Sequence, residues 1–210
     1  MRTNTLLMAM AGGAIVCAPA LGAYTITQGT SAPTYSNTLN FDEVGGPVGG
    51  GLSSDSWTSY GITDLTAGDG NQVVTDASSV PGQSWLGTGN SFFGNFGVFM
   101  TFDTDLSAMS LQVWDPSGAP SPFGGGLAVY LFNNGTEVAA DAYTPAWGGI
   151  GDEWFNIVAD SGMTFDEVRI LGFGFNPTTY VDNLSWNTVP APSSLALLGV
   201  GMIASRRRRA

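Results

Sequence analysis

Residues 127–142, LAVYLFNNGTEVAADA, hold the clearest structural signal in the chain. Leu127 to Phe132 is apolar on both alternating faces, which is typical of a central strand. The pair Asn134-Gly135 follows, and then Thr136 to Ala142. An Asn-Gly pair between two such runs predicts a β-hairpin closed by a tight turn. We therefore expect a fold of antiparallel strands joined by short connections.

The same pattern continues on both sides of this hairpin. Glycine, asparagine, aspartate and serine recur between short apolar stretches, and no stretch of 12 or more residues has a convincing helical period. The sequence predicts an all-β fold, an antiparallel β-sandwich of the jelly-roll type, in one domain spanning residues 24–188. Further strands are expected at Phe96 to Phe102, Met109 to Val113, Trp154 to Ala159, Glu167 to Phe173 and Tyr180 to Trp186.

The charges separate this domain from both ends of the chain. The chain has 17 acids, six bases and no histidine, and its formal net charge is -11. The segment from Tyr24 to Val189 contains all 17 acids and a single base, Arg169, so it carries a formal charge of -16. It also lacks histidine, lysine and cysteine, which excludes a Ser-His-Asp triad, a thiolate nucleophile and a zinc site of the usual ligands. Without a basic patch it cannot hold nucleic acid, and its charge favours cations such as Ca²⁺.

Residues 1–23 are expected to form a signal peptide. Arg2 precedes the apolar run Leu6 to Ala18, and small residues follow up to Ala23. A basic start, a short apolar helix and small residues are typical of a secretory signal that is removed on export. Cleavage after Ala20 or after Ala23 fits this pattern. A lipoprotein signal at Cys17 and a buried N-terminal helix are the alternatives.

Residues 189–210 combine a proline motif, a short hydrophobic helix and an arginine cluster. The apolar run from Ser193 to Ser205 is shorter than the ~20 residues of a typical spanning helix, and the arginines favour a cytoplasmic end. This order resembles the PEP-CTERM sorting signal, although Ala191 stands where that family usually has glutamate. The residues that carry the resemblance are Val189, Pro190, Pro192, Arg206, Arg207, Arg208 and Arg209.

The resemblance implies a route to the cell exterior. Its short helix would hold the protein in the inner membrane of a Gram-negative-type bacterium until a membrane-embedded exosortase recognises and removes the tail. The mature protein would then lie at the cell surface, in the outer envelope or in an exopolysaccharide matrix. The resemblance covers the tail alone and does not describe the preceding domain.

The domain itself is loosely similar to jelly-roll carbohydrate-binding modules and to the secreted sandwiches of PEP-CTERM proteins. The similarity lies in Leu39 to Glu43 and in Tyr180 to Trp186. In such modules an early acidic strand and a closing Asp-Asn strand often meet at a structural calcium ion. The resemblance thus implies Asp42, Glu43 and Asp182 as calcium ligands.

The alternation of side chains independently predicts that Asp182 is buried. Alternation places its carboxylate on the same face as Leu184 and Trp186, which is the expected core face. A buried carboxylate costs several kcal/mol unless it is paired. Asp182 should therefore either accept backbone N–H groups at a strand end or bind a cation, for which Ca²⁺ with its oxygen ligands is the natural candidate.

Six tryptophans suggest a second type of site. Sugar rings stack on exposed indoles while nearby amides and carboxylates bond their hydroxyl groups. Trp114 alternates with the core face of Met109, Leu111 and Val113, and Trp147 lies in a glycine-rich loop, so these two are the candidates for sugar binding. Tryptophan is also a large core residue, and burial is the alternative for each of them.

These features favour an exported, non-catalytic protein of the cell surface or matrix, with exopolysaccharide as its candidate ligand. One alternative is a glycoside hydrolase, which needs two carboxylates about 5 Å or roughly 6.5–9.5 Å apart across a cleft. A further alternative is an ice-binding protein. That function needs a regular array of threonines, which Thr25, Thr27, Thr63 and Thr101 do not form in the sequence.

Overall fold

The computed structural model describes residues 23–44, 52–76, 89–114, 126–143, 153–173 and 178–189. Within these ranges the chain forms eleven strands and two short 3₁₀ helices, and it contains no helix with the length and apolar character needed to span a membrane. The expected signal helix and the expected hydrophobic helix of the tail lie outside the described residues.

Every pairing between the strands is antiparallel, as the sequence predicts. The elements are, in chain order, β1 (Tyr24–Gly29), β2 (Asn37–Leu39), η1 (Asp42–Val44), η2 (Thr58–Tyr60), β3 (Ile62–Ala67), β4 (Val73–Asp76), β5 (Asn90–Asn95), β6 (Val98–Trp114), β7 (Gly126–Asn133), β8 (Thr136–Tyr143), β9 (Trp154–Ala159), β10 (Phe165–Phe173) and β11 (Thr178–Thr188).

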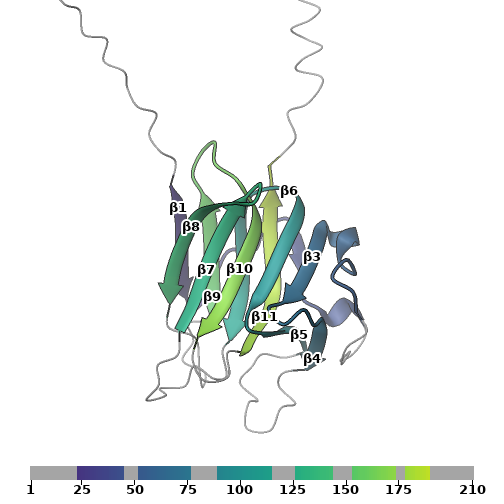
Figure 1. Cartoon of the computed structure of the whole chain (residues 1–210). Helices are drawn as coiled ribbons and strands as arrows, with labels where there is room; N and C mark the ends of the chain where they lie inside the picture. Colours follow the sequence, from purple (N-terminus) through teal and green to yellow (C-terminus); the bar gives the residue numbers. More distant parts are fainter. Residues whose placement is uncertain are drawn as a thin grey trace, which may run out of the picture.

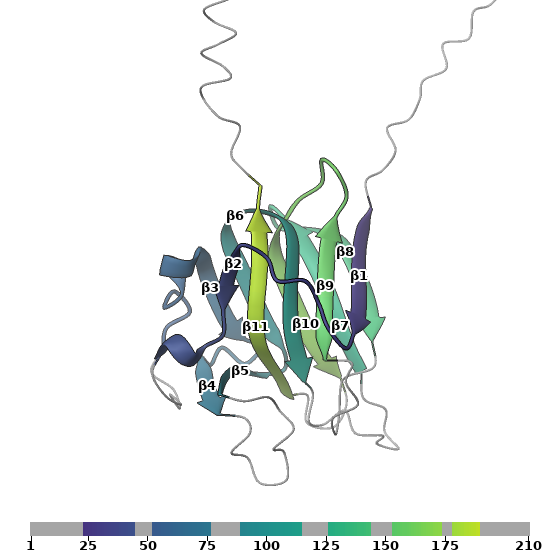
Figure 2. The ribbon, with the colours of Figure 1, turned by 180° about the vertical axis from the view of Figure 1, so that it is seen from behind.

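The strands form two layers that share β6. The layer toward the viewer in Figure 1 has the order β8–β7–β10–β6–β3, and the layer behind it, seen in Figure 2, has the order β1–β9–β6–β11–β5–β4. The first part of β6, Val98 to Leu106, pairs with β3 and β10, whereas Leu106 to Trp114 pairs with β9 and β11. The exposed residues Asp103 to Asp105 therefore mark the bend where β6 passes from one layer to the other.

Alternating apolar side chains build the core between the layers. Val98, Met100, Met109, Leu111 and Val113 are fully buried, and the alternation in the sequence predicts each of them. Phe96 was expected on the same face and is instead 54% exposed. The chain turns at this point, because Phe96 and Gly97 both have positive φ, so β6 begins only at Val98.

The hairpin formed by β7 and β8 agrees with its sequence signal. Asn134 and Gly135 both have positive φ, as a type I′ turn requires. Leu127, Val129 and Leu131 are fully buried, but Tyr130 and Phe132 on the other face are only partly buried. The expectation that this strand is buried on both faces is thus wrong for Tyr130 and Phe132, because the outer face of the front layer is open.

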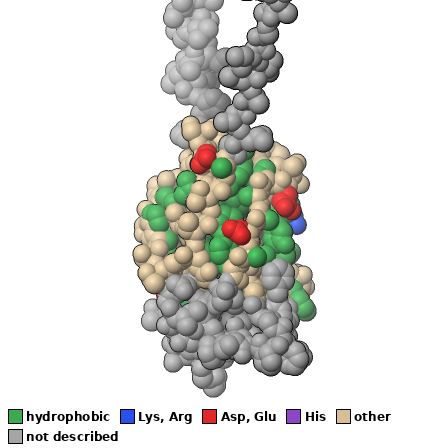
Figure 3. Space-filling model, turned by 90° about the vertical axis from the view of Figure 1, so that its left-hand side faces the viewer, with side chains coloured by type: hydrophobic (Ala, Val, Ile, Leu, Met, Phe, Trp, Pro, Cys, Tyr) green, Lys and Arg blue, Asp and Glu red, His purple; other side chains and the backbone are tan. Residues whose placement is uncertain are grey.

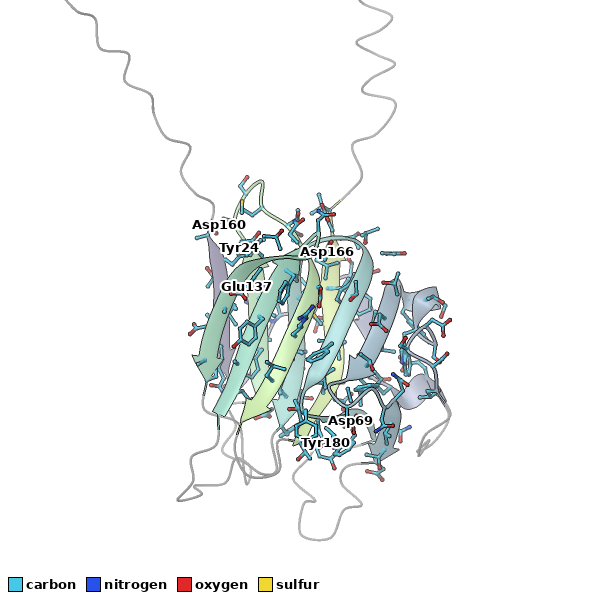
Figure 4. All side chains as sticks on the ribbon, viewed as in Figure 1. Tyr24, Asp69, Glu137, Asp160, Asp166 and Tyr180 are labelled. Atoms are coloured by element: carbon cyan, nitrogen blue, oxygen red, sulfur yellow. The ribbon has the colours of Figure 1, made fainter. Side chains whose placement is uncertain are left out.

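The first and last described strands are tied together at one end of the sandwich. Figure 4 shows Tyr24 and Asp160 at this end and Tyr180 at the opposite one. The Tyr24 hydroxyl donates to the Thr164 carbonyl at 2.8 Å, and the Thr164 hydroxyl donates to the Asp105 carboxylate at 3.1 Å. The Val189 N–H donates to the Asp105 carbonyl at 2.8 Å. The bend of β6 therefore links the start of β1 to the end of β11.

Candidate functional site

Strand β11 changes its partner halfway along its length. Thr178 to Val181 pair with β5, whereas Leu184 to Trp186 pair with β2. On the other edge β11 follows β6, with a shift in register between Asp182 and Ser185. Asn183 lies at the change with φ of 48°, a left-handed conformation that asparagine tolerates better than most residues. This irregularity places Asp182 at the junction of β2, β5 and β11.

The Asp182 carboxylate is buried, but it does not lie on the face that alternation predicts. Its neighbour Val181 lies opposite Val113 in the core, whereas Asp182 lies opposite Gln112, so the register shift after Asp182 places it on the face opposite to Leu184 and Trp186. Asp182 is 2% exposed, and its Oδ1 accepts the N–H of Asn183 at 2.6 Å. Burial raises the pKa of Asp182 from 3.8 to about 7, against the lowering effect of the Asn183 bond, and the charges of Asp42 and Glu43 raise it further. A charged Asp182 is therefore costly unless something compensates it.

Asp42 and Glu43 approach Asp182 from the turn that follows β2. Phe41, which is fully buried at φ of 62°, turns the chain there, and Asp42 begins η1. The Asn90 N–H at the start of β5 donates to Asp42 Oδ1 at 2.8 Å. A Cβ on Gly89 would lie 2.6 Å from that same oxygen, so only glycine allows this close approach. The fold thus brings the three predicted acids to one junction.

The donor chemistry of this junction suits a hard cation, but its acidic side chains do not converge on one point. Carboxylates and backbone carbonyls are the ligands that Ca²⁺ prefers. No three acidic side chains in the described ranges converge closely enough to hold a metal ion as they stand. Asp42 and Glu43 are both exposed, so their side chains would have to turn toward the buried Asp182 to complete a site.

The single cation of the described residues lies elsewhere. Arg169 pairs with Glu167, which lies two residues away on β10 of the front layer, and its guanidinium lies 4.2 Å from the centre of the Phe132 ring. Figure 3 shows acidic groups scattered over one side of the molecule and one basic group beside an acid. The carboxylates of the junction therefore have no counter-ion among the described side chains.

A groove of about 220 Å³ adjoins the junction; we call it the Trp154 groove. Its walls include Trp154 from β9, Asn183 and Ser185 from β11, and Asn40 and Glu43 from the turn after β2. Trp154 is partly exposed and lies at the start of a strand whose alternate residues face the core. The groove therefore combines an accessible indole with two amides, three hydroxyl groups and a carboxylate.

Of the two tryptophans predicted to bind sugar, Trp114 does not line this groove. Trp114 is 4% exposed, so the expectation that it points into solvent is wrong. It lies opposite Tyr180, which is 6% exposed and packs on Phe93 with ring centres 5.2 Å apart, so the outer face is covered at that end of β6. Trp147 lies outside the described residues.

Trp154 could have been identified from its own strand. Phe155, Ile157 and Ala159 are apolar at alternate positions, which places Trp154 on the opposite, outward face. The groove itself could not have been identified in this way, because Asn40 and Asn183 reach it from distant parts of the sequence.

A second groove of about 460 Å³ lies near the bend of β6, and we call it the Tyr60 groove. It is lined by residues before and within β2, by η2, by Asp103 and Thr104 of β6, and by Trp186 and Thr188 of β11. Among the residues that the structure describes, one carboxylate lines each groove, Glu43 in the first and Asp103 in the second.

Several solved structures resemble the fold at low identity. A CBM6-3 module from Clostridium stercorarium in complex with cellobiose is 12% identical, with 76% of this chain and all of that chain covered and a TM-score of 0.34. A family 43 arabinoxylan arabinofuranohydrolase from Bacillus subtilis in complex with cellotetraose is 14% identical over 61% of this chain and 26% of that chain, with a TM-score of 0.34. The tailspike protein 4 of bacteriophage CBA120 is 12% identical over 77% of this chain and 21% of that chain, with a TM-score of 0.33.

The sequence comparisons concern the tail. No curated protein matches the chain. Residues 188–209 match the family model of the PEP-CTERM protein-sorting motif, and this range includes the proline motif and the four arginines on which the resemblance was based. The chain therefore carries a PEP-CTERM sorting motif that follows an antiparallel β-sandwich in the sequence. This motif identifies it as an exported protein that an exosortase sorts to the cell surface or the extracellular space.

Proposed function

We propose that this protein is a non-catalytic polysaccharide-binding protein of the cell surface or matrix and that the Trp154 groove is its sugar-binding subsite. The exposure of Trp154 carries this proposal. Trp57, Trp114 and Trp186 are at most 4% exposed, whereas Trp154 is partly exposed and lines a groove. An accessible indole offers a flat apolar face for a sugar ring.

The other walls of the Trp154 groove suit a neutral, hydroxyl-rich ligand. Asn40 and Asn183 carry amides that both donate and accept, and Glu43 accepts from hydroxyl groups. The volume of about 220 Å³ is below the roughly 300–1,000 Å³ of pockets that enclose a drug-sized molecule. A groove of this size would hold a single unit of a long chain and leave its neighbours in solvent, as binding within a polymer requires.

The arrangement of carboxylates favours binding over hydrolysis. A glycoside hydrolase needs an acid and a second carboxylate on opposite sides of the sugar. The described residues place one carboxylate in each groove, so they supply no such pair in either. The threonines that an ice-binding surface would need are also dispersed, since Thr25 lies on β1 of the back layer and Thr101 on the front part of β6.

A structural Ca²⁺ bound by Asp42, Glu43 and Asp182 is part of the same proposal. It is supported by the buried Asp182 carboxylate, which has no cationic side chain beside it in the described ranges, and by the all-oxygen donor set of the junction. Glu43 belongs to the junction and also lines the Trp154 groove. Bound Ca²⁺ would neutralise the junction and hold the turn after β2 against β11.

Affinity electrophoresis through a gel that contains the exopolysaccharide of the host tests the sugar-binding proposal. The protein purified from its own cells should be retarded, and Trp154→Ala should weaken binding about tenfold, which corresponds to about 1.4 kcal/mol. Phe96→Ala is the matched control, because it removes an aromatic ring that is 54% exposed and lines neither groove. Undiminished retardation of Trp154→Ala would exclude the groove as the subsite. If the unaltered protein is not retarded, polysaccharide binding is wrong and a purely structural role remains.

A further inference from the structure

The Tyr60 groove is a built cavity of a size that fits a ligand. Its volume of about 460 Å³ lies within the range of roughly 300–1,000 Å³ that is usual for small-molecule sites. Its floor includes Trp186, which is 2% exposed, and Tyr60 lines it with a partly exposed ring. The remaining lining is rich in hydroxyl groups, including those of Thr38, Ser59 and Thr188.

The aromatic wall of this groove is held in place by local structure. Helix η2 ends at Gly61, whose φ of 82° closes the turn through an N–H bond of 3.0 Å to the Thr58 carbonyl. Tyr60 therefore packs beside the buried Trp57, with the ring centres 6.3 Å apart. On the opposite wall the Asn37 side chain donates to the Trp186 carbonyl at 3.1 Å. The groove is thus largely pre-formed, which lowers the entropic cost of binding.

Among the described residues that line the groove, Asp103 is the only charged one. Its N–H donates to the Gly61 carbonyl at 3.0 Å, which fixes its backbone beside Tyr60. A Cβ on Gly61 would come within 3.2 Å of Asp103 Oδ1, so the carboxylate lies directly against this glycine. No hydrogen bond or ion pair engages the Asp103 carboxylate within the part of the chain that the structure describes.

We propose that the Tyr60 groove binds an amino-sugar unit whose amine is free and protonated, with the ammonium group on Asp103 and the ring near Tyr60. An ammonium forms a charge-assisted hydrogen bond with a carboxylate, which is stronger than a bond to a neutral group. Hydroxyl groups line the rest of the groove and would bond those of the sugar. The segment charge of -16 attracts cationic ligands and repels uronic acids or phosphorylated sugars.

This site differs from the Trp154 groove in both position and chemistry. Thr38 lines both grooves, but the two aromatic residues and the two carboxylates are distinct. The inference therefore does not depend on the Trp154 subsite. A free amino sugar and a unit within a partly de-N-acetylated polysaccharide share this chemistry, and ligand length separates them.

Isothermal titration of the purified protein with a glucosamine hexamer and with the fully N-acetylated hexamer tests the proposal. The free-amine form should bind about tenfold more tightly, and Asp103→Asn should abolish this preference. Glu137→Gln is the matched control: it removes an equal charge from the exposed edge strand β8, away from both grooves (Figure 4). Trp154→Ala should keep the preference, which separates this inference from the sugar-binding subsite proposed above.

Two further arms exclude simple attraction of a polycation to an acidic protein. An oligolysine of equal charge should bind Tyr60→Ala as well as it binds the unaltered protein, whereas the glucosamine hexamer should bind Tyr60→Ala more weakly. Glucosamine itself tests whether one unit suffices. Equal affinity for the two hexamers, or a preference that persists in Asp103→Asn, would overturn the proposal.

Discussion

Replacement of Asp182 by asparagine should make the protein more stable at neutral pH when no divalent cation is present. The pKa of Asp182 rises from 3.8 to about 7 in the folded state. A difference of about three pKa units, at 1.36 kcal/mol each, corresponds to about 4 kcal/mol. Because the folded pKa is raised, this stability is fully present below about pH 4 and is lost as the pH rises through 7. The asparagine side chain stays neutral and should lack this loss.

Urea unfolding in the presence of a chelator, at about pH 5 and about pH 8, measures the effect. Other acids also titrate in this range, so the informative quantity is the difference in unfolding free energy between the unaltered protein and Asp182→Asn. Between these two pH values the variant should gain about 2.7 kcal/mol on the unaltered protein, because the folded pKa of about 7 lies about two units above the lower pH. Its side-chain oxygen can still accept the Asn183 N–H, and its amide can donate toward the charges of Asp42 and Glu43.

Added Ca²⁺ should offset most of the stability advantage of Asp182→Asn. A cation that binds the ionised junction at a hundred times its Kd stabilises the unaltered protein by about 2.7 kcal/mol, whereas Asp182→Asn should gain much less. Glu137→Gln serves as control and should respond to Ca²⁺ like the unaltered protein. A stability difference that does not change with pH would refute the raised pKa. An equal response to Ca²⁺ in all three proteins would refute the assignment of the cation to this junction.

Three other substitutions test the fold. Gly97→Ala should destabilise the protein by at least about 2 kcal/mol in thermal unfolding, because the residue has φ of 110° and the new Cβ would lie 2.4 Å from the Ile170 carbonyl oxygen; an unchanged midpoint would show that the turn differs. Trp114→Ala should cost about 3–5 kcal/mol through loss of a buried indole and should leave polysaccharide retardation of the folded fraction intact; weaker retardation would restore Trp114 as a sugar ligand. Arg169→Ala should cost no more than about 2 kcal/mol in urea unfolding, because its side chain is 41% exposed. The variant loses one ion pair and the contact with the Phe132 ring. A larger loss would indicate a structural role for this cation.

The parts of the fold that depend on local pattern could be predicted from the sequence. Alternation fixes which side chains of a strand share a face, and this rule alone places Met109 in the core. It misplaces Asp182, because the register shift after that residue interrupts the alternation before Leu184. The turn at Asn134-Gly135 follows from the tolerance of both residues for positive φ. The sorting motif is a linear signal, so its identification does not require the fold at all.

Features that depend on contacts between distant segments could not be predicted in this way. Alternation places Trp114 outward, but burial of that outer face depends on Tyr180 and Phe93, which belong to other strands. The bend of β6 at Asp103 to Asp105 gives no periodic signal, because one continuous strand serves both layers. The Tyr60 groove arises where that bend meets η2 and β2, so it exists only in the folded chain.

The link between the start of β1 and the end of β11 has a mechanical consequence. If the tail is held in a membrane and the domain binds a polymer as proposed above, tension would enter the fold at Val189 and act along β11. This strand lies between β6 on one side and β5 and β2 on the other. A pull at its C-terminal end would act parallel to the strand axis. The inter-strand hydrogen bonds are perpendicular to that axis, so they are loaded in shear and must break together rather than one at a time. A tethered sandwich of this topology resists extraction along β11, and its exposed edge strand β8 lies outside the path of the force.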